Sequence, residues 1–470
     1  MDKLLEIVNT VNTYLSDYIL IVLLVGVGLF FTIKTRFVQV RCFGEGFKKV
    51  FGKFTLRGGK QEGGLSSFQA LATAIAAQVG TGNIVGACGA ILAGGPGAIF
   101  WMWIIAFLGM ATIYAEAVLA QETREVDADG NIQGGPVYYM KKAFPNGFGK
   151  FLSVFFAIAT IIALGFIGVM VQSNSIAGSV ATAAPAIPSF VVGLVVAGIS
   201  AFIFIGGVSR LASVTEKMVP IMAVIYLLGG LAIVIARIQY LPEAVGMIFK
   251  YAFQPQAIIG GAFGAALKAA ISQGAKRGLF SNEAGMGSTP HAHALAKVEK
   301  PHDQGVVAMT GLFIDTFVVL TMTALIVITT LYAGNGVLST ADGAKVAVEG
   351  GLANTNMVQN AFQVVFAGNL GAKIGAIFVA VCLFFFAFST ILSWNLFGKV
   401  NAQYLFGKKA VIVYSVISVL CIFLGTVMKN DLVWALMDMF NQLMVLPNVI
   451  ALVALAGIVV KTSKSNKLQK

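Results

Sequence analysis

The stretch Ala76–Gly89 reads AAQVGTGNIVGACG. It combines four glycines with Gln78, Thr81 and Asn83, and apolar sequence flanks it on both sides. Each glycine lowers helix propensity by about 1 kcal/mol relative to alanine. In a lipid environment, backbone polar groups that leave a helix must find partners inside the protein. The stretch therefore predicts a membrane helix that is broken near its centre.

The composition is that of a polytopic membrane protein. Of the 470 residues, 58% are hydrophobic and only 11% are charged. Apolar runs of about 20 residues recur along the chain, whereas a soluble α/β core requires no such runs. The N-terminus has no small-residue cleavage pattern, so we expect the first span to be retained. The scattered cysteines show no metal-like spacing and are predicted to be packing residues: Cys42, Cys88, Cys382 and Cys421.

Eleven apolar runs are long enough to be transmembrane helices. The predicted spans are 16–34, 68–93, 97–120, 151–180, 188–208, 213–236, 257–290, 306–333, 369–398, 409–428 and 431–460. The fold class is therefore predicted to be all-α.

The distribution of basic residues predicts the orientation of these spans. Eight lysines and arginines lie between Lys34 and Lys60, which marks this loop as cytoplasmic by the positive-inside rule. The N-terminus is then predicted to be outside, and the basic tail 463–470 to be cytoplasmic. The only lysine or arginine in the long predicted outer loop 334–368 is Lys345. The net charge of +12 is thus topological, and no nucleic-acid partner is expected.

A second broken segment is predicted in GAKRGLFSNEAGMGSTPHAHA, residues 274–294. Each of the two broken segments leads a set of five spans, which is the pattern of an inverted-repeat transporter with its substrate site at the bilayer midplane. The predicted organisation is a peripheral N-terminal helix with a basic loop (1–64), two five-helix repeats (65–240 and 241–462) and a basic tail (463–470).

Small residues also allow tight helix packing, which is the structural alternative for GTGNIVG. The polar residues within it, and the second broken segment in the other half of the chain, favour a functional break.

The two motifs resemble the alanine or glycine:cation symporter family (AGCS), also called sodium:alanine symporters. The resemblance covers essentially the whole chain. It implies a LeuT-type fold and sodium-coupled uptake of alanine or glycine by a prokaryotic inner-membrane protein. Sodium would be the coupling ion, with no organic cofactor and no metal beyond sodium.

The resemblance also implies residue roles. QVGTGN, residues 78–83, matches the break of the first core helix, so the freed amides of Gly80, Thr81 and Gly82 would hold the substrate carboxylate. Asn83 would help to hold one sodium ion. A second sodium site would use the carbonyls of Ala76, Val79 and Phe386 with the hydroxyls of Ser389 and Thr390, a pair whose order is reversed relative to the family pattern.

Trp394 stands one helical turn after Thr390, where the pattern has a smaller aliphatic residue. We expect the indole to fill the space that a larger substrate side chain needs, which favours alanine and glycine over leucine.

Further candidates come from polar residues in apolar sequence. The remaining predicted substrate contacts are Gln78, Asn174, Asn282 and Met286. Gln172 is a candidate of the same kind, and interhelical hydrogen bonding is the alternative for both amides of the third core helix. The alternative for the second break is a rim network in which Glu283 pairs with Lys276 and Arg277.

Two further features bear on metal binding and on charge. His291 and His293, at i and i+2, do not share a helix face, which argues against a metal site. Asp315 lies inside an apolar run and is expected to pair with a lysine or arginine near the second break.

No nucleotide-binding or hydrolase motif is present, so the chain is not predicted to be an enzyme. Proton coupling through Glu283 or Asp315 is the runner-up to sodium coupling. A channel or an amino-acid-gated receptor is the other class. The sequence leaves the oligomeric state and the preference for L- or D-alanine open.

Overall fold

The structure is a computed structural model that describes residues 2–52, 65–127, 130–254, 263–366 and 368–465. It confirms that the chain is an all-helical membrane protein. The start of the predicted span at 257, the basic residues Lys53, Arg57 and Lys60, and residues 466–470 of the predicted tail lie outside the described residues.

The helices follow one another along the chain, and one short hairpin interrupts them. The α-helices are α1 (Asp2–Tyr14), α2 (Ile21–Lys34), α3 (Val38–Arg41), α4 (Phe43–Phe51), α5 (Ser67–Gln78), α6 (Ala87–Gly94), α7 (Ala98–Glu122), α8 (Pro136–Ala143), α9 (Gly147–Thr160), α10 (Val169–Ala183), α11 (Ser189–Ile205), α12 (Gly207–Ala236), α13 (Leu241–Phe253), α14 (Phe263–Asn282), α15 (Pro290–Ala294), α16 (Pro301–Phe313), α17 (Thr321–Val327), α18 (Ala341–Glu349), α19 (Met357–Val365), α20 (Asn369–Phe406), α21 (Ala410–Gly425), α22 (Asn430–Ala454) and α23 (Ala456–Ser465). The π-helical segments are η1 (Leu15–Leu20), η2 (Gly82–Gly86), η3 (Ile161–Gly168), η5 (Ile314–Leu320) and η6 (Ile328–Tyr332), and η4 (Ile238–Tyr240) is a 3-10 turn. The antiparallel strands are β1 (Glu125–Val126) and β2 (Ile132–Gln133).

Several of these stretches are long and apolar enough to cross a membrane. Within the described residues there are seven continuous ones, and an eighth if the bent pair α5 and η2–α6 forms one span. The continuous stretches are Lys3–Lys34, Ala98–Glu122, Gly147–Ala183, Gly207–Ala236, Pro301–Tyr332, Leu370–Phe406 and Asp431–Ala454. The other three predicted spans fall on the shorter apolar helices α11 and α21 and on α14.

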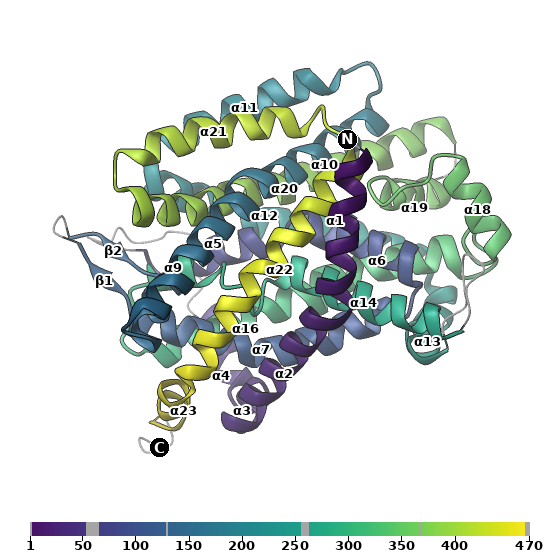
Figure 1. Ribbon diagram of the computed structural model, residues 1–470. Helices are drawn as coiled ribbons and strands as arrows, with labels where there is room; N and C mark the ends of the chain where they lie inside the picture. The colour runs from purple at the N-terminus through teal and green to yellow at the C-terminus, as the bar shows by residue number, and fades with distance from the viewer. Residues whose placement is uncertain (1, 53–64, 128–129, 255–262, 367, 466–470) are drawn as a thin grey trace.

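The outer helices turn apolar side chains away from the protein. Helices α11 and α21 pack side by side on one flank, as Figure 1 shows at the top of the view. Large apolar side chains on outward faces are strongly exposed, for example Phe202 at 66%, Leu228 at 63% and Ile412 at 72%. Because such surface is unfavourable in water, these faces fit a lipid environment.

The structure differs from the predicted spans in two places. The N-terminal helical stretch begins at Lys3, well before the predicted start at residue 16. The predicted outer loop 334–368 contains α18 and α19, and Phe362 of α19 stacks on Phe378 of α20 at 5.4 Å. A search for continuous apolar runs does not find α1 or α19, because both helices are amphipathic and only one face of each is apolar.

The first and last described helices, α1 and α23, lie on opposite sides of the molecule. The N-terminal helix and Asn354 of the 334–368 segment line one cavity together. Arg41 of α3 donates to the carbonyl of Ser463 near the C-terminus at 3.3 Å. In Figure 1 helix α1 begins on the side of the molecule where α19 lies, whereas α23 lies on the side of α3 and α4.

Candidate transport site

The first break lies where α5 ends and η2 begins. A capping box formed by Ser66 and Gln69 starts α5, and the helix ends at Gln78. The backbone then bends by 42° before continuing as η2 and α6. The amides at the bend are held locally, because Gly80 N donates to Asn83 Oδ1 at 3.0 Å and to Gln78 O at 2.9 Å.

Close approach, rather than unusual dihedrals, explains the glycines of the first break. Neither Gly80 nor Gly82 has a positive φ. A Cβ on Gly80 would lie 2.2 Å from Thr390 Oγ1, and a Cβ on Gly82 would lie 2.9 Å from the Cα of Ser281. The break is therefore pressed directly against α20 on one side and α14 on the other.

Gln172 of α10 joins the first break and is the most informative polar neighbour. Its Oε1 accepts the amide hydrogen of Thr81 at 3.3 Å. Its Nε2 and the Oγ1 of Thr81 are both buried without a hydrogen-bond partner. Buried polar atoms are nearly always paired, so two such atoms at one place are typical of a ligand site.

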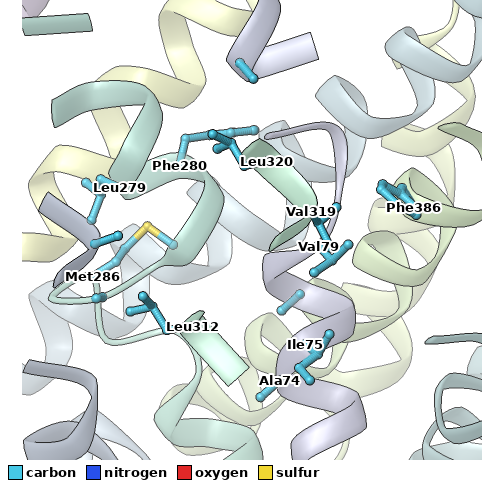
Figure 2. Packing of buried hydrophobic residues seen from close by; sticks show 14 of the residues in the cluster. Ala74, Ile75, Val79, Leu279, Phe280, Met286, Leu312, Val319, Leu320 and Phe386 are labelled. Carbon is cyan, nitrogen blue, oxygen red and sulfur yellow. The ribbon is translucent and has the colours of Figure 1, made fainter. Parts of the chain in front are cut away.

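The predicted second sodium site brings together hydroxyls and carbonyls. Thr390 Oγ1 lies 2.8 Å from Ala76 O and 3.1 Å from Phe386 O. Ser389 Oγ lies 2.9 Å from Phe386 O and 3.5 Å from Ala76 O. The reversed pair thus places both hydroxyls on the same two carbonyls. Val79 caps the C-terminal end of α5, and its side chain belongs, with Val319, to the buried apolar cluster of Figure 2.

Asp315 forms a second polar cluster that the sequence analysis did not assign to sodium. Asn83 donates to Asp315 Oδ1 at 2.7 Å, Ser281 to Oδ2 at 3.0 Å and Thr316 to Oδ2 at 2.8 Å. The expected pairing of Asp315 with a lysine or arginine near the second break is therefore wrong. Both Asn83 and Asp315 lie in π-helical segments, which are frequent at functional sites.

The second break follows α14 and is built differently. Glu283, Gly285 and Gly287 have φ values of +60°, +90° and +81°. Such left-handed positions favour glycine, and at Glu283 the conformation is strained. Gln78 connects the two breaks, because its Nε2 donates to the carbonyl of Asn282 at 2.8 Å.

Glu116 of α7 holds the second break in place. Its Oε1 accepts from Gly285 N at 3.2 Å, Gly287 N at 3.0 Å and Asn448 Nδ2 at 2.7 Å. Asn448 of α22 also donates to the carbonyl of Gly285 at 2.9 Å. One carboxylate therefore replaces the helical partners that two backbone amides have lost. Glu116 was not among the residues predicted from sequence, although a charge in the long apolar helix α7 is a signal of a functional residue.

Glu283 and Trp394 meet beside the second break. The indole Nε1 donates to Glu283 Oε1 at 2.5 Å, and Ser288 donates to the other carboxylate oxygen. The ring packs edge-on against Phe280 at 5.8 Å and closely approaches Gly168. Glu283 therefore does not pair with Lys276 and Arg277, and the alternative of a rim network that joins these three residues is wrong.

Lys276 and Arg277 belong to a closure on the side of the N-terminus. Arg277 forms a two-point ion pair with Asp438 of α22 at 2.9 and 3.1 Å, and Lys276 adds a contact to Asp438 at 3.3 Å. The guanidinium lies 4.7 Å from the ring of Trp434, which in turn packs on Phe280. Lys276, Arg277, Asp438 and Trp434 form one wall of a cavity of about 420 Å³, and Asn9 and Asn354 also line it.

Two predicted substrate contacts lie apart from this arrangement. Asn174 Nδ2 donates to the carbonyls of Gly425 and Met428 at 2.8 and 2.9 Å, which is the interhelical alternative. Met286 is fully buried and shares an apolar cluster with Leu279 and Leu312 (Figure 2). Asn282 Oδ1 accepts the amide hydrogen of Ala284, whereas Asn282 Nδ2 is buried without a hydrogen-bond partner.

The histidines of the second motif serve packing. His291 stacks on Phe397 at 5.4 Å and contacts Asn401 at 2.8 Å, whereas His293 contacts Gln304 at 2.8 Å. The two imidazoles thus engage different partners.

Two broken helices face each other in this membrane protein, with amides and hydroxyls at the breaks and an ion-paired closure on the side of the N-terminal helix. This is the architecture of a secondary transporter. The solved structure of MhsT in complex with L-phenylalanine resembles this chain with a TM-score of 0.56 at 16% identity, covering 86% of this chain and 100% of that one. This likeness confirms the predicted LeuT-type fold.

Sequence comparison identifies the family. The profile of the sodium:alanine symporter family matches residues 1–470, so the chain belongs to that family. The chain is 41% identical over 468 residues to the sodium/alanine symporter AgcS of Methanococcus maripaludis, covering 99% of this chain and 98% of that protein. It is 40% identical to the putative sodium/proton-dependent alanine carrier protein YrbD of Bacillus subtilis, covering 99% of this chain and 93% of that protein. The chain is therefore a sodium-coupled amino-acid symporter and not an enzyme.

Proposed function

We propose that this protein couples sodium entry to the uptake of a small neutral amino acid, alanine or glycine, by alternating access. One observation carries the placement of the substrate. Thr81 Oγ1 and Gln172 Nε2 are buried without partners at the first break, and Gln172 Oε1 holds the Thr81 amide between them. Because a zwitterion supplies both acceptors and donors, it would satisfy these atoms.

The proposed carboxylate site is the turn Gly80–Gly82. Its amides lie at the start of a half-helix, where the backbone dipole favours an anion. Gly80 N is shared with Asn83 in this structure, so substrate binding would exchange this internal contact for the carboxylate. Gln78, Asn282 and Thr390 border the same region. We leave Asn174 and Met286 out of the site, because their surroundings serve helix packing.

Two sodium sites are proposed. One uses the carbonyls of Ala76, Val79 and Phe386 with the hydroxyls of Ser389 and Thr390. Each of the two hydroxyls lies within 3.5 Å of both Ala76 O and Phe386 O. The other uses Asn83 with the Asp315 cluster. Oxygen atoms are the ligands that hard cations prefer, and a carboxylate supplies the charge that offsets dehydration.

Trp394 is proposed to set the size of the substrate. Glu283 fixes the indole nitrogen, and Phe280 and Gly168 enclose its ring. An indole that cannot rotate leaves room for a methyl group but not for a branched side chain.

We also propose eleven spans in two five-helix repeats behind the N-terminal helix, with the N-terminus outside and the C-terminal tail cytoplasmic. The opposite placement of the chain ends supports this topology. The Arg277–Asp438 pair would then be the external gate.

Proton coupling is the second candidate, because Asp315 and Glu283 are buried carboxylates beside the breaks. The name of the relative YrbD mentions both sodium and proton dependence. Asp315→Asn and Glu283→Gln separate the two mechanisms in proteoliposomes. Sodium coupling predicts that Asp315→Asn raises the sodium concentration needed for half-maximal alanine uptake. Uptake that persists without sodium but collapses in Glu283→Gln would overturn it.

Calorimetric titration of the purified protein with glycine, alanine, serine and leucine, with and without sodium, tests the substrate class. Alanine and glycine are expected to bind only with sodium. Thr81→Val is expected to weaken alanine binding without lowering the melting temperature. Unchanged binding in Thr81→Val, or equal binding of leucine and alanine, would contradict the proposed site.

A further inference from the structure

We infer that Cys42, Glu45 and His302 form a binding site for a transition-metal dication with the ligand preferences of zinc. One donor atom of each side chain lies within 4.8 Å of the donor atoms of the other two. The three residues lie on the side of the molecule that carries the C-terminal end of α23. This inference does not depend on the proposed substrate and sodium sites.

Local structure brings the three residues together. Cys42 is the N-cap of α4 and Glu45 follows three positions later, so both point from the same face of the helix. His302 is the second residue of α16, which packs against α4. The sequence analysis missed the group because 257 positions separate Glu45 from His302.

The existing distances approach those of a coordinated ion. His302 Nε2 and Glu45 Oε2 are 3.4 Å apart. Two nitrogen or oxygen ligands at about 2.0–2.2 Å from a tetrahedral zinc ion lie about 3.4 Å from each other. One thiolate at a Zn–S distance of about 2.3 Å lies about 3.6 Å from each of these ligands. Because no two donor atoms are more than 4.8 Å apart, the thiolate needs to approach its partners by roughly an ångström, which a small rotation about the Cα–Cβ bond of Cys42 supplies.

Tyr114 of α7 orients the imidazole. Its hydroxyl lies 2.7 Å from His302 Nδ1, and both side chains are buried. Metal-bound histidines almost always use their second nitrogen in this way, because the outer hydrogen bond fixes the tautomer and the ring orientation. Nδ1 is thus engaged by Tyr114, and Nε2 is directed to Glu45.

The donor set favours zinc over magnesium and calcium. Sulfur, nitrogen and a single carboxylate suit zinc and similar dications, whereas magnesium and calcium require mainly oxygen ligands. Three protein ligands leave a fourth position for water or another ligand. The ligands themselves supply the charge that a dication needs, because the Glu45 carboxylate and a Cys42 thiolate are both negative. Asp303 lies nearby and pairs with Lys49 at 3.1 Å.

The site would fasten α4 to the first turn of α16. These helices already touch, since Phe43 packs edge-on against Phe313 at 4.8 Å and a Cβ on Gly46 would lie 2.4 Å from Thr310 Oγ1. A metal ion would therefore bind without moving either helix. Because an ion that binds only the folded protein stabilises it, zinc is expected to raise the melting temperature.

Cobalt(II) is the probe for the experiment, because its spectrum reports thiolate ligation. Full-length protein in detergent, without a polyhistidine tag and stripped with a chelator, is titrated with cobalt(II). We expect one equivalent to bind with a thiolate-to-cobalt charge-transfer band and with tetrahedral d–d bands, and zinc to displace it. Cys42→Ser is expected to abolish the charge-transfer band, and Glu45→Gln and His302→Gln to weaken binding.

Controls separate the site from other effects. Tyr114→Phe keeps all three ligands and is expected to weaken metal affinity by about tenfold. Cys421→Ser, on α21, should leave the titration unchanged. Metal-free melting temperatures identify any variant that fails to fold. The inference is overturned if the wild type shows no charge-transfer band with stoichiometric cobalt, or if folded Cys42→Ser shows the same band.

Discussion

The two breaks differ in how they leave the helix. At the first, Gly80 and Gly82 keep ordinary φ values, and the backbone is crowded by Thr390 and Ser281. At the second, Glu283, Gly285 and Gly287 adopt left-handed φ values. The first break therefore needs glycine for space, and the second needs glycine for conformation.

The breaks also differ in what replaces the lost helical hydrogen bonds. Amide side chains from other positions hold the first, since Gln172 and Asn83 accept from Thr81 N and Gly80 N. A carboxylate holds the second, since Glu116 accepts from two backbone amides. Neutral amide contacts are easier to exchange for a ligand than a charge-assisted clamp is. The difference supports the proposal that the first break binds the ligand and that the second is a fixed support.

The largest effect is expected from crowding the first break. Gly80→Ala places a Cβ 2.2 Å from Thr390 Oγ1 and disturbs both the substrate turn and a proposed sodium ligand. Sodium-driven alanine uptake in proteoliposomes is expected to fall to background. Gly89→Ala is the matched control, because its Cβ meets nothing closer than Asn354 Nδ2 at 3.5 Å. Uptake at the wild-type rate in Gly80→Ala would show that the first break is not a tight site.

Removing the clamp of the second break comes next. Glu116→Ala leaves the amides of Gly285 and Gly287 and the Asn448 side chain without this acceptor. Each unsatisfied buried donor costs about 1–3 kcal/mol, so we expect a marked fall in the melting temperature in detergent. Glu116→Gln retains one carbonyl oxygen and should lose less. An equal loss in the two variants would argue against the clamp.

A smaller effect is expected from the conformation of the second break. Gly285→Ala forces alanine to a φ of +90°, which costs about 1–3 kcal/mol of folding free energy. Gly278→Ala is the matched control. Gly278 lies in the helical backbone of α14, and a Cβ there meets Ile105 at an ordinary 3.5 Å. This control is expected to be neutral or stabilising in thermal unfolding. Equal melting temperatures for the two variants would contradict the conformational role.

The smallest effect is expected from Trp394→Phe. The substitution removes the hydrogen bond to Glu283 but keeps an aromatic ring, so we expect a stability loss of about 1 kcal/mol with alanine selectivity retained. Trp394→Ala should in addition allow leucine to compete with alanine uptake. If leucine competes equally with both variants, the ring does not set the substrate size.

The sequence predicted much of the fold because its signals are local. Apolar runs predicted most of the spans, and the glycine-rich motifs predicted both breaks. Helix α14 ends at Asn282, where the second break begins. It missed α19, whose apolar face is too narrow for a run-based search. It also missed Glu116, because one carboxylate in a long apolar helix does not reveal its partners along the chain.

The site was predictable only in part. Gln78, the glycines, Asn83, Ser389 and Thr390 lie around one junction, as the resemblance implied. Asn174 lies elsewhere, although it is only two positions from Gln172, because residues two apart on a helix face different neighbours. The predicted partners of Asp315 and Glu283 were wrong, because charge alone suggested lysine and arginine. Amide and hydroxyl groups donate to Asp315, and an indole donates to Glu283.

The sequence by itself determined that this is an all-helical membrane transporter of the sodium:alanine symporter family with two broken helices, because hydropathy and motif are properties of neighbouring residues. Only the tertiary structure decided that Gln172 meets Thr81, that Asp315 meets Asn83, that Glu116 holds the second break, and that Cys42, Glu45 and His302 converge. These contacts join residues far apart in the chain, and packing of the helices fixes which faces meet.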